Sequence, residues 1–172
     1  MSEKVWEQLG EDISGMNIKD DSGFSVSLSD NGLHVAIGAP ATDGGSSHGV
    51  VKVYSYNRYN DSWRRIGRDI SGISSGDQMG WCVSLSSDGS YLAVASPTED
   101  TGSQTTLQVN GFVLPLQDEL EGVVRVYQYE SDLDDGSWRY LSGDLSFDLN
   151  TTSENGLTYQ GNGLMTGYNI SL

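Results

Sequence analysis

The side chains in this chain that could act as nucleophiles, acids, bases or metal ligands include two histidines, one cysteine and 24 acidic residues. His34 and His48 lie at the start of a predicted strand and in a predicted loop, without a nucleophile or metal-ligand pattern nearby. Cys82 falls inside a strand-like run, which predicts a buried, unreactive thiol, and a single cysteine excludes an intrachain disulfide. Motifs of serine hydrolases, phosphate-binding loops and zinc peptidases are absent from the sequence. We therefore expect no catalytic residue, no cofactor and no metal.

Three aspartates recur at matching places in the sequence, Asp12, Asp69 and Asp144. Their recurrence predicts a structural role, in which each accepts hydrogen bonds from backbone amides at a corner of the fold. The densest acidic turn, residues 132–136, is predicted to be a solvated hairpin turn. A glycosidase needs two carboxyl groups that face one cleft. Nothing in the sequence singles out such a pair. The enzymatic alternative is therefore a protein such as a glycoside hydrolase whose catalytic residues lie outside this chain.

The charge balance limits the possible partners. Nine basic against 24 acidic residues give a net charge of −15, whereas binding to nucleic acid needs clustered lysine and arginine. No apolar run is long enough to span a bilayer, and residues 1–6 show no signal-peptide pattern. We expect neither nucleic-acid binding nor membrane insertion.

The strongest signal in the chain is an internal repeat. Gly23-Phe24-Ser25-Val26-Ser27 returns as Gly80-Trp81-Cys82-Val83-Ser84 and, in degraded form, near residues 166–172. A second phrase, Trp-x-x-Leu/Ile-Gly-x-Asp-Ile-Ser-Gly, begins at residue 6 and again at residue 63. Both phrases repeat after 57 residues. A fixed period of this size indicates an array of like units that bury their apolar faces against one another.

Each unit contains four short runs of strand-like residues separated by glycine-containing turns. In the first unit they are residues 24–29, 34–39, 49–56 and 63–70, and in the second residues 81–86, 91–96, 122–129 and 138–145. Four antiparallel strands per repeated unit describe the blade of a β-propeller. A two-sheet sandwich is the alternative all-β design, but it gives no reason for the period. The predicted fold is an all-β, partial β-propeller.

The repeat also predicts how the chain is divided. Residues 1–22 form an orphan outer strand and a linker, residues 23–72 the first blade and residues 80–145 the second. Residues 146–172 form a long loop and the first strand of an incomplete third blade. Because propellers close with about four to eight blades, the chain is expected to be a fragment of a longer propeller. The alternative is self-association into a ring through open sheet edges.

The phrases that run from Gly23 to Pro40 and from Gly80 to Pro97 resemble the FG-GAP repeat, the blade motif of integrin-α-like propellers. This resemblance covers nearly the whole chain. It implies an adhesion or ligand-binding module, extracellular or at the cell surface, without catalytic chemistry. Glycosylation sequons at Asn60, Asn150 and Asn169 fit that setting.

Calcium-binding members of that family carry an Asp-x-Asp-x-Asp-Gly loop between the first two strands of a blade. The matching turns here, residues 29–32 and 86–89, hold one carboxylate each, and calcium needs six to eight oxygen ligands. We therefore expect no calcium in them. Residues 86–96 also resemble part of a WD40 blade, but the Gly-His and Trp-Asp pairs are missing and the period exceeds the usual 40–45 residues. A WD40-like intracellular scaffold is the second alternative.

Two loops of the second unit are much longer than their counterparts. Pro97 to Gly122 spans 25 positions against nine in the first unit, and the connection after the fourth strand is also extended. Both insertions fall on the same face of a propeller and are adjacent around the ring. Residues 106–116 read as a hairpin turned by Asn110-Gly111, and residues 145–150 with 157–160 as another. Loops on a rigid scaffold often carry recognition, so the sequence predicts a protein or glycan ligand here. The predicted contact residues are Phe112, Asp118, Glu119 and Tyr159.

Overall fold

In the computed structural model, the described strands form three antiparallel sheets. The part of the chain that the structure describes comprises residues 5–41, 47–99, 106–109, 112–115, 122–131, 136–141, 149–152 and 158–161. No helix occurs within these ranges. The prediction of an all-β chain is confirmed.

The first unit forms sheet 1. Its strands follow the order β1 (Ser25–Leu28), β2 (His34–Ala39), β3 (Val50–Asn57) and β4 (Ser62–Arg65), and β5 (Ile70–Ser71) also pairs with β3. Gly32 closes the turn after β1 with a φ of 69°, a conformation that glycine adopts without strain. β2 ends at Ala39, directly before Pro40, whose nitrogen cannot donate to a ladder.

The second unit forms sheet 2 with the same design. Its strands are β6 (Cys82–Leu85), β7 (Tyr91–Ser96), β10 (Val123–Glu130) and β11 (Ser137–Tyr140). The first four strands of both units have four, six, eight and four residues. β1 and β6 therefore occupy equivalent places, which confirms the strand equivalence that the repeat predicts.

The predicted fourth strand, residues 63–70, is interrupted. Tyr54 lies opposite Arg65 and Val51 opposite Ile70, so five steps along β4–β5 match only three along β3. The two extra residues bulge out of the ladder, which breaks the strand into β4 and β5. Gly67, with a φ of 67°, lies in this bulge. In the second unit the described part of the predicted strand 138–145 contains one strand, Ser137–Tyr140, and residues 142–145 of the prediction lie outside the described residues.

Residues 5–15 contain no strand, although the sequence predicts an outer strand there. A strand needs a partner, and no described strand pairs with this segment. The segment nevertheless accepts a hydrogen bond from a tryptophan of the following strand, a contact that recurs in the next unit. Trp63 Nε1 donates to the Leu9 carbonyl at 2.9 Å, as Trp138 Nε1 donates to the Ile66 carbonyl at 3.3 Å. The residue after each carbonyl is a glycine with a φ of 67°.

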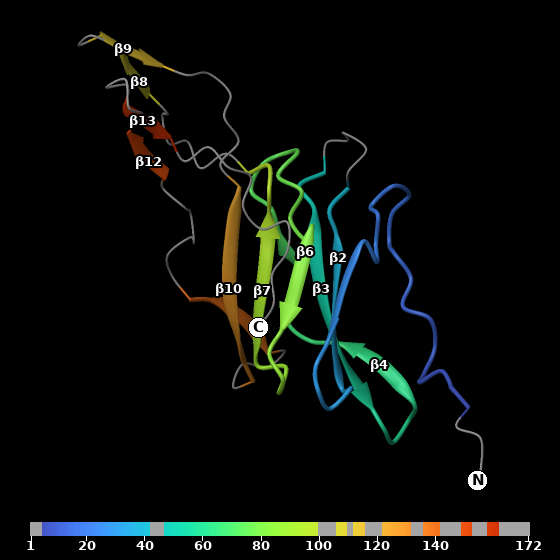
Figure 1. The fold of residues 1–172 in the computed structure, drawn as a ribbon. Helices are drawn as coiled ribbons and strands as arrows, with labels where there is room; N and C mark the ends of the chain where they lie inside the picture. The colour runs from blue at the N-terminus through green and yellow to red at the C-terminus, as the bar shows by residue number, and fades with distance from the viewer. Residues whose placement is uncertain are drawn as a thin grey trace.

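Sheets 1 and 2 lie side by side, as Figure 1 shows for β2 and β3 against β6, β7 and β10. Hydrogen bonds join β1 to the second unit: the Leu85 amide donates to Ser27 Oγ at 2.9 Å, and Ser25 Oγ donates to the Gly80 carbonyl at 2.7 Å. One buried cluster contains residues of both sheets and Met79 from the segment between them, namely Ala36, Val51, Val53, Ile70, Met79, Val83, Leu85, Leu92, Val94 and Trp138. The core of the described chain is thus shared between the units.

The recurrent aspartates have partners other than those predicted. Asp12 accepts a hydrogen bond from the Gln8 side chain, and Asp69 pairs with Arg65 at 2.9 Å. Both are side-chain donors that lie four residues away, so neither aspartate accepts backbone amides as we expected. Asp144 lies outside the described residues.

The backbone amides of each connecting loop are bound instead by Asp20 and Asp77, which are also 57 residues apart. Asp77 Oδ2 accepts from the amides of Ile73 and Ser74 at 2.7 and 2.6 Å. Asp20 accepts from three amides at 3.0–3.1 Å. Burial opposes ionisation of Asp20, but these amides and the charge of Lys52 outweigh it and lower the pKa of Asp20. Each aspartate fixes the loop that leads into the next unit.

We expect Asp77→Ala to reduce the free energy of unfolding by about 2 kcal/mol, because two backbone amides lose a charged acceptor that is itself buried. Asp20→Ala is the matched control and should cost about 1 kcal/mol, since Asp20 is only half-buried whereas Asp77 is buried. Urea unfolding followed by tryptophan fluorescence measures both. The contribution of Asp20 should disappear as the pH falls below 3.8, its ordinary pKa, because its folded pKa is lower. A larger loss for Asp20→Ala than for Asp77→Ala would contradict this account.

Candidate functional site

The two insertions of the second unit meet in one sheet. β8 (Thr106–Val109) and β9 (Phe112–Pro115) form a hairpin, as do β12 (Leu149–Thr152) and β13 (Thr158–Gly161), and β13 pairs with β8. We call these four strands the insertion sheet, and Figure 1 shows it at one end of the molecule, far from β4. The prediction that the insertions are neighbours is confirmed.

Both predicted hairpins are present with small shifts. The first matches residues 106–116, although its turn residues Asn110 and Gly111 lie outside the described residues. In the second, the first strand begins at Leu149 rather than at residue 145. The order β12-β13-β8-β9 places the second hairpin against the outer side of β8.

The register divides the insertion sheet into two unlike faces, because residues directly opposite each other in an antiparallel pair share a face. Leu107 is opposite both Leu114 and Tyr159, and Val109 is opposite Phe112. One face therefore carries Leu107, Val109, Phe112, Leu114, Leu149, Thr151, Tyr159 and Gly161. The other carries Thr106, Gln108, Val113, Pro115, Asn150, Thr152, Thr158 and Gln160. The first set is mainly apolar and the second mainly polar.

The predicted contact residues are distributed accordingly. Phe112 in β9 and Tyr159 in β13 fall on the same, apolar face, with β8 between their strands. Asp118 and Glu119 lie outside the described residues. The register thus places the two aromatic members of the predicted site on one face of the insertion sheet, two strands apart.

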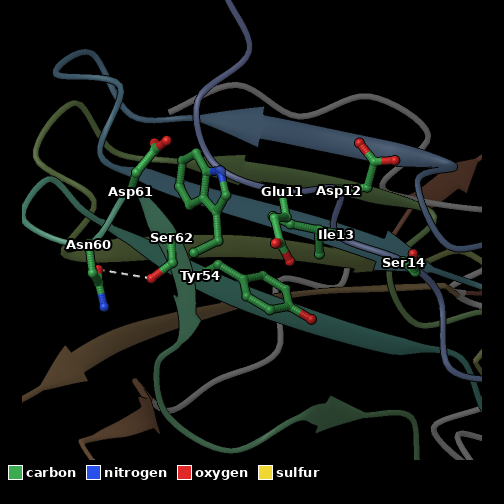
Figure 2. Close-up of a pocket in the computed structure, with 9 residues that line it drawn as sticks. Glu11, Asp12, Ile13, Ser14, Tyr54, Asn60, Asp61 and Ser62 are labelled. Carbon is green, nitrogen blue, oxygen red and sulfur yellow. Dashed lines mark hydrogen bonds between the residues drawn. The ribbon is translucent and has the colours of Figure 1, made fainter.

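A second candidate, which the sequence reasoning missed, is a pocket of about 400 Å³ between the N-terminal segment and the β3–β4 hairpin (Figure 2). We call it the junction pocket. It is lined by Glu11, Asp12, Ile13, Ser14, Tyr54, Asn60, Asp61, Ser62 and Trp63. The signal in the sequence was the repeated Leu/Ile-Gly pair, which marks the carbonyl that each tryptophan binds.

The polar groups of the junction pocket already hold the chain together. Asp61 Oδ1 accepts from the Gly10 amide at 2.9 Å, and the hydroxyl of Tyr56 also bonds to that carboxylate. This bond to Asp61 raises the pKa of Tyr56, and burial raises the pKa of Tyr54. Together with the Trp63 bond to Leu9, these contacts attach the N-terminal segment to sheet 1.

The carboxylates of the junction pocket do not converge. Figure 2 shows Glu11, Asp12 and Asp61 directed to different sides. Within the described ranges, no group of three or more histidine, cysteine or acidic side chains is arranged to hold a metal ion. The insertion sheet is therefore the stronger candidate for binding.

The turns that the sequence compared with calcium loops are closed by their own side chains. Asp88 Oδ1 accepts from Ser86 Oγ, from Ser90 Oγ and from the Ser90 amide at 2.7–2.9 Å. These bonds, the one from the Ser90 hydroxyl foremost, lower the pKa of Asp88 to about 2. In the first unit Asn31 Oδ1 accepts from the Leu33 amide at 2.8 Å. Both side chains act as turn caps.

The remaining residues that the sequence analysis considered for chemistry are His34, Cys82 and the acidic turn 132–136. His34 begins β2 and packs against Gly89, and burial lowers its pKa. Cys82 is half-buried rather than buried as predicted, since it is the first residue of β6. Residues 132–135 of the acidic turn lie outside the described residues.

Comparison with known proteins does not assign the chain to a family. In the described part of the chain, no helix is long and apolar enough to cross a membrane. Searches against protein-family models and against curated proteins found no match.

Proposed function

We propose that the chain is a non-catalytic β-propeller interaction module of integrin-α-like type, and that it binds a protein through the apolar face of the insertion sheet. The observation that carries the proposal is the shared face of six apolar residues spread over four strands, with Phe112 and Tyr159 among them. Aromatic residues surrounded by aliphatic ones are typical of the centre of protein interfaces.

The arrangement of the units supports the propeller part of this proposal. Two sheets with equal strand order stack through their inner strands β1 and β6, which is how neighbouring blades of a propeller are related. In that scheme both insertions extend from the same face of the ring. A rigid pair of blades would then present the insertion sheet to a partner with little loss of entropy on binding.

The aliphatic residues favour a protein over a glycan as the partner. Leu107, Val109 and Leu114 accompany Phe112 on adjacent strands, and apolar side chains of a protein partner would bury their surface. Sugar hydroxyls would instead need several polar groups on that face, where the register places two hydroxyl-bearing residues, Thr151 and Tyr159.

Panning a phage-displayed random peptide library against the whole chain tests the proposal. We expect enriched peptides rich in aromatic and aliphatic residues, and Phe112→Ala with Tyr159→Ala should weaken the best peptide at least about 10-fold in fluorescence anisotropy. The control, Gln108→Ala with Gln160→Ala, changes the polar face of the same strands and should alter binding less than about twofold.

Thermal unfolding by circular dichroism establishes that both double variants keep the fold. Peptides that bind equally well to the Phe112/Tyr159 variant would overturn the proposal. Binding on a glycan array that depends on the same two residues would also overturn it, because the partner class would then be carbohydrate.

A further inference from the structure

The β3–β4 hairpin of the first unit carries a further pocket, of about 460 Å³. We call it the hairpin pocket. The residues that line it include Leu33, Asn57, Arg58, Tyr59, Arg64 and Ile66. None of the described residues that line it is acidic, although the chain contains 24 acidic residues. The hairpin pocket is therefore a positively charged place on a chain whose net charge is −15.

The second unit contains the same arginine with an anion bound to it. Arg64 lies opposite Ser55 in sheet 1. Arg139 lies opposite Gln128 at the equivalent register of sheet 2, so the two arginines are counterparts. Arg139 Nε donates to the carboxylate of Glu130, and Arg139 Nη2 donates to Gln128 Oε1 at 3.1 Å. An arginine at this repeat position thus holds a carboxylate.

The first unit lacks both of these internal acceptors. Asn57 stands where the second unit has Glu130, and its amide carries no charge. Ser55 stands where the second unit has Gln128, and its side chain is much shorter. Within the described residues Arg64 forms no ion pair, whereas three other arginines are each paired with a carboxylate. The guanidinium of Arg64 is therefore open to an anion from outside the chain.

Arg58 adds a second positive charge to the hairpin pocket. It follows Asn57 directly, at a place where the second unit has Ser131. Asn57 Oδ1 accepts from the Tyr59 amide at 2.9 Å, which fixes the turn that carries Arg58. Guanidinium groups bind carboxylates through short, charge-assisted hydrogen bonds, often two in parallel. Two arginines that line one pocket therefore suit a carboxylate better than the single arginine of the second unit does.

The hairpin pocket also offers apolar and aromatic surface beside the arginines. Leu33 and Ile66 line it, and Ile66 packs against the buried cluster shared by the two sheets. Tyr59 lines it as well, and its side chain is fully exposed. Tyrosine provides a large contact area at a low cost in conformational entropy. A ligand with an apolar group next to its carboxylate would therefore contact more than the two guanidinium groups.

We infer that the hairpin pocket binds a peptide through a carboxylate, which Arg58 and Arg64 hold in the place that Glu130 occupies in the second unit. The anion in that equivalent place is a protein carboxylate, which makes a peptide the fitting ligand. An apolar side chain of the peptide packs against Tyr59. The hairpin lies far from the insertion sheet (Figure 1), so this inference does not depend on the proposed function.

Three capped dipeptides of nearly equal size test the inference at physiological ionic strength, where the Debye length of about 8 Å screens the distant carboxylates of the chain. Acetyl-Phe-Glu-amide presents a side-chain carboxylate, acetyl-Phe-Gln with a free C-terminus presents a chain-end carboxylate, and acetyl-Phe-Gln-amide presents neither. In nitrogen–proton correlation spectra of the labelled chain, we expect at least one charged peptide to shift the amide signals of residues 55–66. The uncharged peptide should bind at least about 10-fold more weakly. The charged peptide that binds more tightly identifies the source of the carboxylate.

Arg64→Gln removes one of the two charges and should weaken binding of that peptide at least about 10-fold. The matched control is Arg65→Gln, which makes the same change at the next residue of β4. Successive residues of a strand point to opposite faces, and Arg65 is paired with Asp69. We therefore expect Arg65→Gln to change binding less than about twofold.

Asn57→Glu is the most specific variant, because it gives the first unit the acceptor of the second. The introduced carboxylate should bind Arg64 and exclude the peptide. Asn57→Gln has the same length without the charge, and both changes remove the bond from the Tyr59 amide to Asn57. Asn57→Glu should therefore bind the peptide at least about 10-fold more weakly than Asn57→Gln.

Unchanged amide signals outside the hairpin establish that the variants keep the fold. Equal binding to Asn57→Glu and Asn57→Gln would overturn the inference. So would an uncharged peptide that binds as tightly as the charged ones, or the absence of shifts in residues 55–66 with all three peptides.

Discussion

Leu85→Ala will lower the free energy of unfolding by about 3 kcal/mol, whereas Leu28→Ala will lower it by less than about 1 kcal/mol. The two leucines occupy the same repeat position in strands of equal length and register. Leu85 is buried in the cluster between the sheets, and Leu28 is exposed. The difference between the two losses therefore measures the stacking of the units rather than the intrinsic preference for a strand.

Urea unfolding at a chain concentration low enough to keep the protein monomeric measures this difference. The pair Val83→Ala and Val26→Ala provides a second comparison and should show the same direction at smaller magnitude, because valine loses fewer methyl groups. Equal losses at residues 28 and 85 would mean that the units fold without covering one another.

Glu99→Ala will destabilise the chain by about 3 kcal/mol or more, because it leaves a buried guanidinium without its carboxylate. Glu99 accepts from Arg125 through both oxygens, at 2.8 and 2.5 Å, and the Glu99 side chain is only 3% exposed. The Glu99 carbonyl also accepts from the Gly122 amide at 3.2 Å. These contacts join the two ends of the insertion that carries β8 and β9. The Glu99–Arg125 ion pair therefore holds the start and the end of this insertion together.

The double variant Glu99→Leu with Arg125→Met is the informative control. Replacing both partners of a buried ion pair by apolar residues of similar size is often close to neutral. We therefore expect it to regain most of the stability that Glu99→Ala loses, as measured by urea unfolding. A double variant that is less stable than Glu99→Ala would show that the pair itself does not explain the loss.

The repeat made the strands predictable because it shows the same pattern twice. Alternating residues and a glycine turn located β1 and β2, and the 57-residue period located β6 and β7 at the same register. Loop lengths also predicted that the two insertions are neighbours. The pairing of β13 with β8 was beyond this reasoning, since it joins segments about fifty residues apart through contacts that no local pattern encodes.

The features that the sequence did not reveal are those that depend on tertiary neighbours. The bulge between β4 and β5 lies in a run that reads as a continuous strand, and Gly67 is required there because a Cβ would come within 2.6 Å of Trp138 Cδ1. The Glu99–Arg125 pair has no repeated counterpart in the sequence, since the position 57 residues before Glu99 is Thr42, which has no carboxylate. The repeat therefore predicts the features that both units share, and it does not predict contacts that only one unit makes.

The stacking of like units is tested most directly by nuclear Overhauser effects between the two sheets in the monomeric chain. We predict cross peaks between the ring protons of Phe24 and Trp81, whose ring centroids are 4.7 Å apart. We also predict cross peaks from the indole N–H of Trp138 to Ile66 and Gly67, because this N–H donates to the Ile66 carbonyl. Assigned spectra without either set, or with Phe24 in contact with residues of another part of the chain, would contradict the account.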